Sequence, residues 1–422
     1  MMPVYGLAED ISSLEENLVK TVTLFDLDGV LIKPGGYRAA FHAAMNYFLD
    51  KMGLNLEIGP QEHDLVIFES YGVTAEWDML PVSLLIIFES YHQHFNEEIK
   101  LFNLQQALTW VAGHSPMEII IDYEQFLARL APYFWLTSTP AESVLCACQN
   151  GHGDQLFPHL FQQPLLLQLL SNTRNALVSL TTRLLQNFQL GSEIFEQIYQ
   201  IPAEVETKST LQVNDRSLIS ESNRLELIKL LNQKRIFMSY VTLRPSYPPK
   251  ELSLSKVGYP PEAELALEKM DLLDVPLIAY GRMQYLAGKL NIPTASLVKP
   301  YPYQALAGIK AALDGEELPA LSWVGKIYQL MHSIESKDHT GLPALADIDR
   351  SDELDIHIFE DMPVGIRSAR EASDMLRKFG MKIRFTAWGI AYDERMKAVL
   401  SGEGGRVFND INIAFQEFLK LM

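Results

Sequence analysis

The sequence contains few cysteines and comparatively few basic residues. Only Cys146 and Cys148 occur among 422 residues, and two cysteines so close together do not suggest an ordinary disulfide or, by themselves, a metal site. Thirty-five Lys and Arg residues stand against 53 Asp and Glu residues, for a net charge of −18. Such an acidic chain disfavours nucleic acid and anionic membranes as partners. Because the two cysteines are not expected to form a disulfide, we expect them to be buried thiols in a reducing, cytoplasmic compartment.

Long hydrophobic runs are also missing. The most apolar stretch, Leu80–Phe88, is much too short to span a membrane. The segment Met1–Lys20 lacks the basic start and apolar core of a signal peptide. The chain has no Gly-x-Ser-x-Gly, Walker or dinucleotide-binding glycine pattern. The enzyme classes that these motifs characterise therefore gain no support. Its length, with 48% hydrophobic residues, is sufficient for two domains.

The most informative motif that is present lies at residues 22–31, Val-Thr-Leu-Phe-Asp-Leu-Asp-Gly-Val-Leu. An apolar, β-branched run that stops at Asp and Gly is typical of a buried strand that opens into a loop. In an open parallel sheet, ligands bind at this end of the strands. Asp26 and Asp28 there could bind a divalent cation, or one could attack a substrate while the other moves protons. A solvated turn is the simpler interpretation of the motif alone.

A second apolar run, within Arg235–Pro245, ends in a small hydroxyl residue. Thr242 at that strand end could donate a hydrogen bond to a phosphoryl oxygen. Ser239 is the alternative, but it falls inside the apolar run and is expected to be buried. A threonine that merely closes a strand would give the same pattern.

Two further motifs follow in the same order along the chain. Lys299 precedes a proline, which disfavours helix, and lies where a loop enters the helix expected from Tyr303. A lysine at such a place can neutralise a phosphate, or it can be an ordinary surface residue. Glu360 and Asp361 end another apolar run, and adjacent acids there repel each other unless a cation or a proton lies between them.

Alternation of strand and helix predicts an α/β fold with a doubly wound parallel sheet. Polar and Asp-rich residues within 314–355 follow an expected helix at Leu321–Ile334, and we interpret that loop as a surface excursion. The expected strands are Val22–Phe25, Ile236–Val241, Pro276–Ala279, Ser296–Val298, Ile356–Phe359 and Lys382–Thr386, and the expected helices are Pro261–Leu272, Met283–Leu290, Tyr303–Leu313 and Pro363–Lys378.

Roughly two hundred residues separate the first motif from the second, and they show helical periodicity. We expect them to form an inserted all-α domain at 37–229, whereas 15–36 and 230–422 form the discontinuous α/β domain. The flanks at Lys33–Gly36 and Thr207–Asn223 are candidate hinges. The clearest expected helices of the insertion are Tyr37–Met52, Leu104–Val111, Tyr123–Leu130, Asn172–Gln186 and Ser192–Tyr199.

These four motifs together resemble those of the haloacid dehalogenase (HAD) superfamily. That pattern is Asp-x-Asp after the first strand, Ser or Thr after a second, a Lys, and an acidic pair after a later strand. Two segments are especially close to the family's motifs. The family's fourth motif resembles Phe-Glu-Asp-Met-Pro-Val-Gly-Ile-Arg-Ser-Ala, and its third resembles Lys-Pro-Tyr-Pro. The inserted helical segment has the position of the family's C1-type cap, although it is larger than a minimal one.

The resemblance implies catalytic roles at four positions. Asp26 is the expected nucleophile that forms an aspartyl-phosphate, and Asp28 the general acid and base. Thr242 and Lys299 are expected to bind the phosphoryl group. Because a carboxylate is repelled by a phosphate dianion, positive charge from the lysine and a cation must offset that repulsion.

The resemblance also implies a Mg²⁺ site. Its expected ligands are Asp26, the backbone carbonyl of Asp28, Asp361 and, with it, Glu360. The acid at position 28 disfavours the dehalogenase and phosphonate-hydrolysing branches, and the Asp-Lys-Thr-Gly of the ion-pump branch is absent.

The predicted function is therefore Mg²⁺-dependent hydrolysis of a small phosphorylated metabolite. A phosphomutase of the same fold, like beta-phosphoglucomutase, would use the same residues, and a non-catalytic binding or regulatory protein is the alternative from another class. A large closing cap favours a small substrate over a macromolecule. Further candidates for substrate binding, each also compatible with a structural or surface role, are Gly29, Glu76, Trp77, Asp78, Arg174 and Arg244.

Overall fold

The computed structural model describes residues 19–96, 99–114, 119–253, 255–270, 272, 274–332 and 353–422. Most of the Asp-rich loop predicted within 314–355 lies outside these residues. The helix expected before it is present as α16, Glu317–His332. Among the described residues, no helix combines the length and apolar character needed to cross a membrane.

The chain folds as two compact units, one formed by residues 1–33 with 216–422 and the other by 34–215. The sequence placed the divisions after residues 36 and 229. The structure places the later division before residue 216. It lies earlier than expected because α12 (Glu221–Asn232) packs its Leu227 and Leu230 with the strands of the first unit. We call the first the sheet unit and the second the helical unit.

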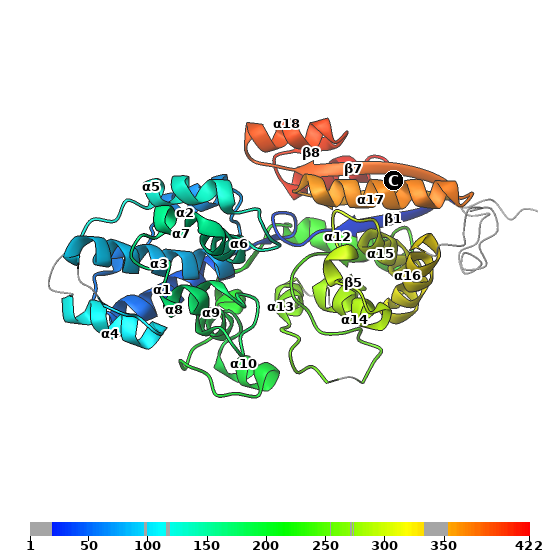
Figure 1. Ribbon diagram of the computed structural model, residues 1–422. Coiled ribbons are helices and arrows are strands. Elements are labelled where there is room, and N and C mark those ends of the chain that lie inside the picture. Colours follow the sequence, from blue (N-terminus) through cyan, green and yellow to red (C-terminus); the bar gives the residue numbers. More distant parts are fainter. Residues whose placement is uncertain are drawn as a thin grey trace, which may run out of the picture. The chain divides into compact units, whose positions relative to one another are not determined.

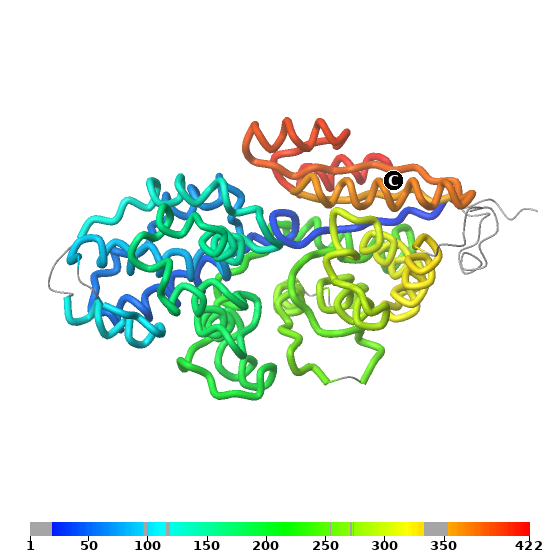
Figure 2. Tube along the Cα trace, viewed as in Figure 1, coloured from blue at the N-terminus to red at the C-terminus, as the bar shows by residue number. Residues whose placement is uncertain are grey.

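A six-stranded, all-parallel sheet forms the centre of the sheet unit in the described residues, in the order β5-β4-β1-β6-β7-β8. This agrees with the predicted doubly wound α/β class. Figure 2 shows how blue, green and orange-red segments, far apart in sequence, combine in this unit. The strands are β1 (Lys20–Phe25), β4 (Phe237–Val241), β5 (Leu277–Ile278), β6 (Glu353–Glu360), β7 (Lys382–Ile390) and β8 (Arg406–Phe408).

Alternating side chains of the strands bury both faces of the sheet. Val22 and Leu24 of β1 pack into one apolar cluster, with helices α14 to α17, whereas Phe25 packs into the other, with α12, α13 and α19. This period of two is what a strand covered on both sides requires. Figure 1 shows α17 running beside β7. The remaining helices of the unit are α13 (Glu262–Glu268), α14 (Tyr280–Leu290), α15 (Tyr303–Asp314), α17 (Pro363–Lys378), α18 (Glu394–Gly402) and α19 (Ile411–Leu419).

The two crossings between the units run next to each other. β2 (Ile32–Lys33), just before the helical unit, pairs antiparallel with β3 (Arg216–Ser217), just after it. Lys33 of β2 and both residues of β3 lie within the predicted hinge segments, whereas Ile32 lies just before the first of them. It joins the chain's exit from the sheet unit to its return.

The described residues of the helical unit are all-α and surround one apolar cluster, to which α3 contributes a long run of buried residues. The two long helices α1 and α3 carry the largest apolar faces, which bury Phe41, Phe48 and Phe88 completely. Its helices are α1 (Gly35–Lys51), α2 (Glu62–Ser70), α3 (Glu76–Phe95), α4 (Leu104–His114), α5 (Tyr123–Leu130), α6 (Pro140–Ala147), α7 (Gly153–Leu156), α8 (Pro164–Leu170), α9 (Leu180–Leu190), α10 (Ser192–Tyr199) and α11 (Thr210–Asn214).

Two local predictions are wrong. The strand expected at Ser296–Val298 is instead a 3₁₀ turn at Thr294–Ser296, because Pro293 starts the turn and its carbonyl accepts the Ser296 N–H. The helix expected from Asn172 begins at Leu180, since Ser179 caps it by accepting the Thr182 N–H. The turn before it holds Asn172 at a positive φ of 58°, which a helix excludes.

Candidate active site

Three of the four predicted motifs lie where the neighbouring strands β4, β1 and β6 end. Asp26 directly follows β1, and its backbone N–H donates to Phe359 O of β6 at 3.0 Å. Glu360 is the last residue of β6, and Asp361 follows it. Because β1 and β6 are adjacent and parallel, the acids after one strand lie beside those after the other.

Lys299 lies between these acids. Its ammonium Nζ is 2.6 Å from Glu360 Oε2 and 3.2 Å from Asp26 Oδ2, and its side chain is only 2% exposed. Burial acts to lower the pKa of Lys299, but the carboxylates of Asp26 and Glu360 outweigh it, so the pKa is raised and the lysine stays charged. The sequence indicated this lysine, but not its contact with Glu360.

Asp26, Lys299, Glu360 and Asp361 form what we call the sheet-edge cluster. One carboxylate oxygen from each of its three acids lies within 4.8 Å of the others. Burial, and then repulsion from Asp26, raise the pKa of Glu360 well above its ordinary value and that of Asp361 to about 7. Around the single Lys299 ammonium of this described cluster, three carboxylates leave negative charge that a cation would neutralise. An all-oxygen donor set of this kind fits Mg²⁺.

Two glycines make room for the acids of the cluster. Gly29 has a φ of +71°, and a Cβ on it would lie 2.0 Å from Asp361 Oδ2. A Cβ on Gly365, in the first turn of α17, would lie 1.7 Å from Glu360 Oε2. Any side chain at either position would displace a carboxylate. Gly29, a candidate for substrate binding, therefore has a structural reason to be glycine.

Asp28 points to a different partner from Asp26. The buried guanidinium of Arg244 contacts its carboxylate side-on: Nε lies 2.9 Å from both oxygens, and Nη2 2.5 Å from Oδ1. The Arg244 side chain is 1% exposed and that of Asp28 34%. The sequence suggested that Arg244 could bind substrate, whereas the structure brings it to the predicted general acid.

Thr242 follows β4, the other neighbour of β1. Its Oγ1 accepts the Arg244 N–H at 3.3 Å. Ser239, the alternative, is fully buried and donates to Gly308 O of α15 at 2.9 Å, so it packs between sheet and helix. Thr242 is therefore the hydroxyl at the strand end.

Gln304 is a residue that sequence reasoning missed. Its Nε2 donates to Thr242 O at 2.8 Å and to Ile278 O at 3.0 Å, while its Oε1 accepts the Lys299 N–H at 3.3 Å. The fully buried amide thus fixes the loop after β4, the end of β5 and the backbone of the lysine. The only sequence signal was a polar residue within the apolar start of α15.

The remaining candidates belong to the helical unit, where three of them meet. Arg174 Nη2 lies 2.5 Å from Oδ2 of the fully buried Asp78, and its guanidinium lies over the Trp77 ring, 5.4 Å from the centroid. Asp78 Oδ1 also accepts the Ala141 N–H. Glu76 is the first residue of the same helix, α3. These contacts make Asp78 an anchor for the partly exposed arginine.

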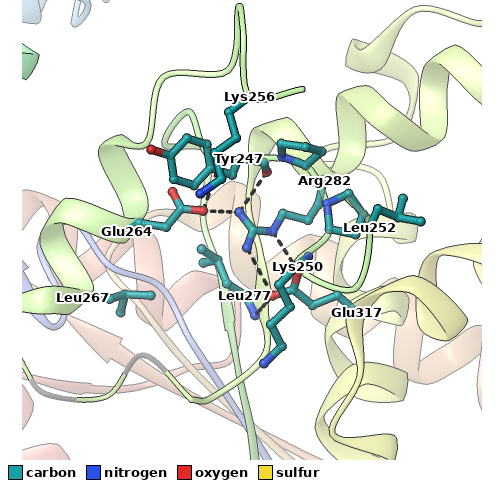
Figure 3. Close-up of a pocket in the computed structure, with 11 residues that line it drawn as sticks. Tyr247, Lys250, Leu252, Lys256, Glu264, Leu267, Leu277, Arg282 and Glu317 are labelled. Atoms are coloured by element: carbon teal, nitrogen blue, oxygen red, sulfur yellow. Dashed lines mark hydrogen bonds and ion pairs between the residues drawn. The ribbon is translucent and has the colours of Figure 1, made fainter. Parts of the chain in front are cut away.

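A second buried ion-pair cluster lies elsewhere in the sheet unit (Figure 3). Arg282 contacts Glu264 and Glu317, with Nε 3.0 Å from Glu317 Oε2 and Nη1 2.8 Å from Tyr247 O. These three side chains, our arginine cluster, line a cavity of about 230 Å³ beneath the proline-rich loop after β4. The backbone N–H groups of Lys250 and Leu277 also donate to Glu317. The cluster ties this loop to α13, α14 and α16.

Comparisons with known proteins support the fold alone. No family model matches the chain, and no curated protein matches it. The X-ray structure of a Northeast Structural Genomics Consortium target has a TM-score of 0.57 at 14% identity, covering 95% of this chain and 99% of that one. A crystal structure described as a "putative beta-phosphoglucomutase" from Thermotoga maritima has a TM-score of 0.34 at 11% identity, covering 96% and 100%. The first likeness agrees with the α/β architecture, and the second is too distant to carry an argument.

Proposed function

We propose that this protein is a Mg²⁺-dependent phosphohydrolase of the HAD type that acts on a small phosphorylated metabolite. The observation that carries the proposal is the sheet-edge cluster, in which three strand-end carboxylates gather around one buried lysine. Such a surplus of buried negative charge is costly unless a cation binds there. One of the three carboxylates of the cluster, that of Asp26, is the proposed nucleophile.

Asp26 is the proposed nucleophile. Its Oδ1 accepts the Leu27 N–H at 2.8 Å, and its Oδ2 faces the Lys299 ammonium. These contacts fix the orientation of the carboxylate before substrate binds, which lowers the entropic cost of attack. Mg²⁺ held by Asp26, Glu360 and Asp361 would supply positive charge that offsets the repulsion between carboxylate and phosphate.

Asp28 is the proposed general acid and base. It protonates the departing ester oxygen while Asp26 attacks, and it then accepts a proton from the water that hydrolyses the aspartyl-phosphate. Its position two residues after the nucleophile, with a partly exposed side chain, supports both transfers. Thr242 and Lys299 are the proposed ligands of the phosphoryl oxygens.

The helical unit is the proposed cap and source of specificity. Trp77 and Arg174 form an aromatic and cationic pair that could receive a ring or an acidic group of a substrate. Asp78 would hold the arginine, and Glu76 is the remaining candidate contact. Nucleic acid and membranes are not among the proposed partners, because of the acidic composition.

A phosphate-release screen tests the proposal. Phosphorylated metabolites and aryl phosphates are incubated with the protein in Mg²⁺, then in EDTA, with Asp26→Asn as the blank. Release that requires Mg²⁺ and vanishes in the variant supports the proposal and identifies the substrate class. Silence across the panel would reject the hydrolase, and transfer of phosphate within a sugar phosphate would identify a mutase instead.

A further inference from the structure

Arg244 is held rigidly before it reaches Asp28. Its backbone N–H donates to Thr242 Oγ1 at 3.3 Å, and its carbonyl accepts the Tyr280 N–H at 3.1 Å. Its Nη1 donates to Glu262 O, at the start of α13, at 3.4 Å. With its backbone held at both ends and its guanidinium held at Nη1, Arg244 presents its Nε and Nη2 edge in one direction. That edge faces the Asp28 carboxylate.

The two oxygens of Asp28 are not equivalent in this contact. Oδ1 accepts from both Nε and Nη2 of Arg244, at 2.9 and 2.5 Å. Oδ2 accepts from Nε, which it shares with Oδ1, at 2.9 Å. A proton placed on Oδ2 leaves the shortest contact of the pair, Nη2 to Oδ1, intact, whereas a proton on Oδ1 would face both Nε and Nη2.

We propose that Arg244 is the positioning residue for acid–base chemistry at Asp28, anchoring Oδ1 so that Oδ2 carries the transferred proton. This inference rests on the proposed function. In this proposal Arg244 does not bind the substrate. Positioning of Asp28 replaces the substrate-binding role that the sequence suggested. The Arg244 side chain is 1% exposed, and its guanidinium contacts Asp28 and Glu262, which is consistent with positioning.

The two proton transfers balance through Oδ2. As the bond from Asp26 to phosphorus forms, the bond from phosphorus to the ester oxygen breaks, and that oxygen takes the Oδ2 proton to leave as an alcohol. Water then attacks the phosphorus of the aspartyl-phosphate and gives one proton to Oδ2. The bond to Asp26 breaks, inorganic phosphate leaves, and both carboxyl groups return to their starting states.

Dependence on the leaving group provides the test. A dinitrophenolate leaves without protonation, whereas phenolate from phenyl phosphate needs it. We expect Arg244→Met to lower kcat/KM for phenyl phosphate on the order of 10²-fold, and for a dinitrophenyl phosphate by less than about 10-fold. Arg244→Lys, which keeps the charge but loses the side-on contact, should fall between wild type and Arg244→Met in the ratio of the two rates. Equal losses for both substrates would overturn the inference.

Arg282→Met is the matched control, because it removes another buried arginine that pairs with carboxylates in the same unit. It should leave the ratio of the two rates unchanged, even where it lowers stability. A ratio that shifts as much as in Arg244→Met would reduce Arg244 to a structural role. In an Asp28→Asn background, Arg244→Met should leave the ratio unchanged, and a further change would also contradict the inference.

A double-mutant cycle measures the interaction between Asp28 and Arg244 without an activity assay. Urea unfolding of wild type, Asp28→Asn, Arg244→Met and the double variant should give an interaction between the two positions, whereas additive effects would mean that the pair does not form. If wild type releases no phosphate from either aryl ester, the proposed hydrolase fails. If wild type is active but the variants keep its ratio, only the role of Arg244 fails.

Discussion

The sheet-edge cluster and the arginine cluster both bury acids around a cation in the same unit, but they differ in how their charge is compensated. In the arginine cluster, two carboxylates share the guanidinium of Arg282 and several backbone N–H groups. In the sheet-edge cluster, Asp26 and Glu360 contact one ammonium, and the carboxylate of Asp361 lies within 4.8 Å of theirs. Burial and repulsion between the acids raise the pKa values of Glu360 and Asp361. Burial also raises the pKa of Glu264, and its Oε2 is buried without a hydrogen-bond partner among the described residues. The clusters therefore differ in charge balance: two acids to one cation tie a loop to three helices, whereas a third acid at the strand end indicates a place for a ligand.

The strongest test of this contrast is loss of activity. We expect Asp26→Asn to lower kcat/KM by at least about 10³-fold, because the amide cannot attack phosphorus. Its circular dichroism should match that of wild type. Arg282→Met should retain activity at temperatures where it is folded. Phosphate release by Asp26→Asn at the wild-type rate would remove the basis for the contrast.

The free energy of unfolding, measured with and without Mg²⁺, should also distinguish the two clusters. Arg282→Met leaves buried Glu264 and Glu317 without their cation, at an expected cost of about 3–5 kcal/mol in the free energy of unfolding. Lys299→Met should also destabilise the protein without metal, but Mg²⁺ should restore part of that loss. Urea unfolding of both variants, with and without Mg²⁺, measures the difference. Equal rescue of the two variants by Mg²⁺ would contradict it.

Metal affinity should respond at Asp361. Removing one of three carboxylates weakens charge compensation, so Asp361→Ala should raise the Mg²⁺ concentration for half-maximal activity about 10-fold or more. Glu394→Ala, at an exposed acid on α18, is the control for general charge effects. A Mg²⁺ titration unchanged in Asp361→Ala would exclude this residue as a ligand.

The smallest expected effect is on pH dependence. Burial and then Asp26 raise the pKa of Asp361 from 3.8 to about 7, so between these values the folded protein binds more protons than the unfolded chain. Stability of the metal-free protein should therefore fall as pH rises through this window, by roughly a few degrees in Tm. Thermal melts from pH 5 to 8 should show a smaller fall with Mg²⁺ or in Asp361→Asn. A fall unaffected by either change would assign it to other groups.

Sequence reasoning located the strand ends because apolar runs that stop at acids are local signals. Asp26, Thr242 and Glu360 each follow or end a strand, and their proximity follows from the order of a parallel sheet. What the sequence could not supply were contacts between distant segments. The pairing of Arg244 with Asp28 spans 216 residues, and that of Lys299 with Glu360 spans 61.

Local conformation was predictable where periodicity was strong and failed where turns competed. Helices α5 and α10 have the predicted bounds, Tyr123–Leu130 and Ser192–Tyr199. The strand expected at Ser296–Val298 failed because Leu297 and Val298 are buried as turn residues, which a short apolar run cannot distinguish from a strand. Gln304 was missed since a single buried amide leaves no pattern in the sequence.

Trapping of the covalent intermediate tests the central claim most directly. The protein is mixed with a substrate found in the phosphate-release screen and Mg²⁺, quenched in acid and reduced with borohydride, which converts an aspartyl-phosphate to homoserine. Mass spectrometry of the peptide that contains residues 22–31 should then show homoserine at Asp26, and none in the sample without substrate. Reduction at another residue, or none during active turnover, would contradict the assignment of Asp26 as the nucleophile.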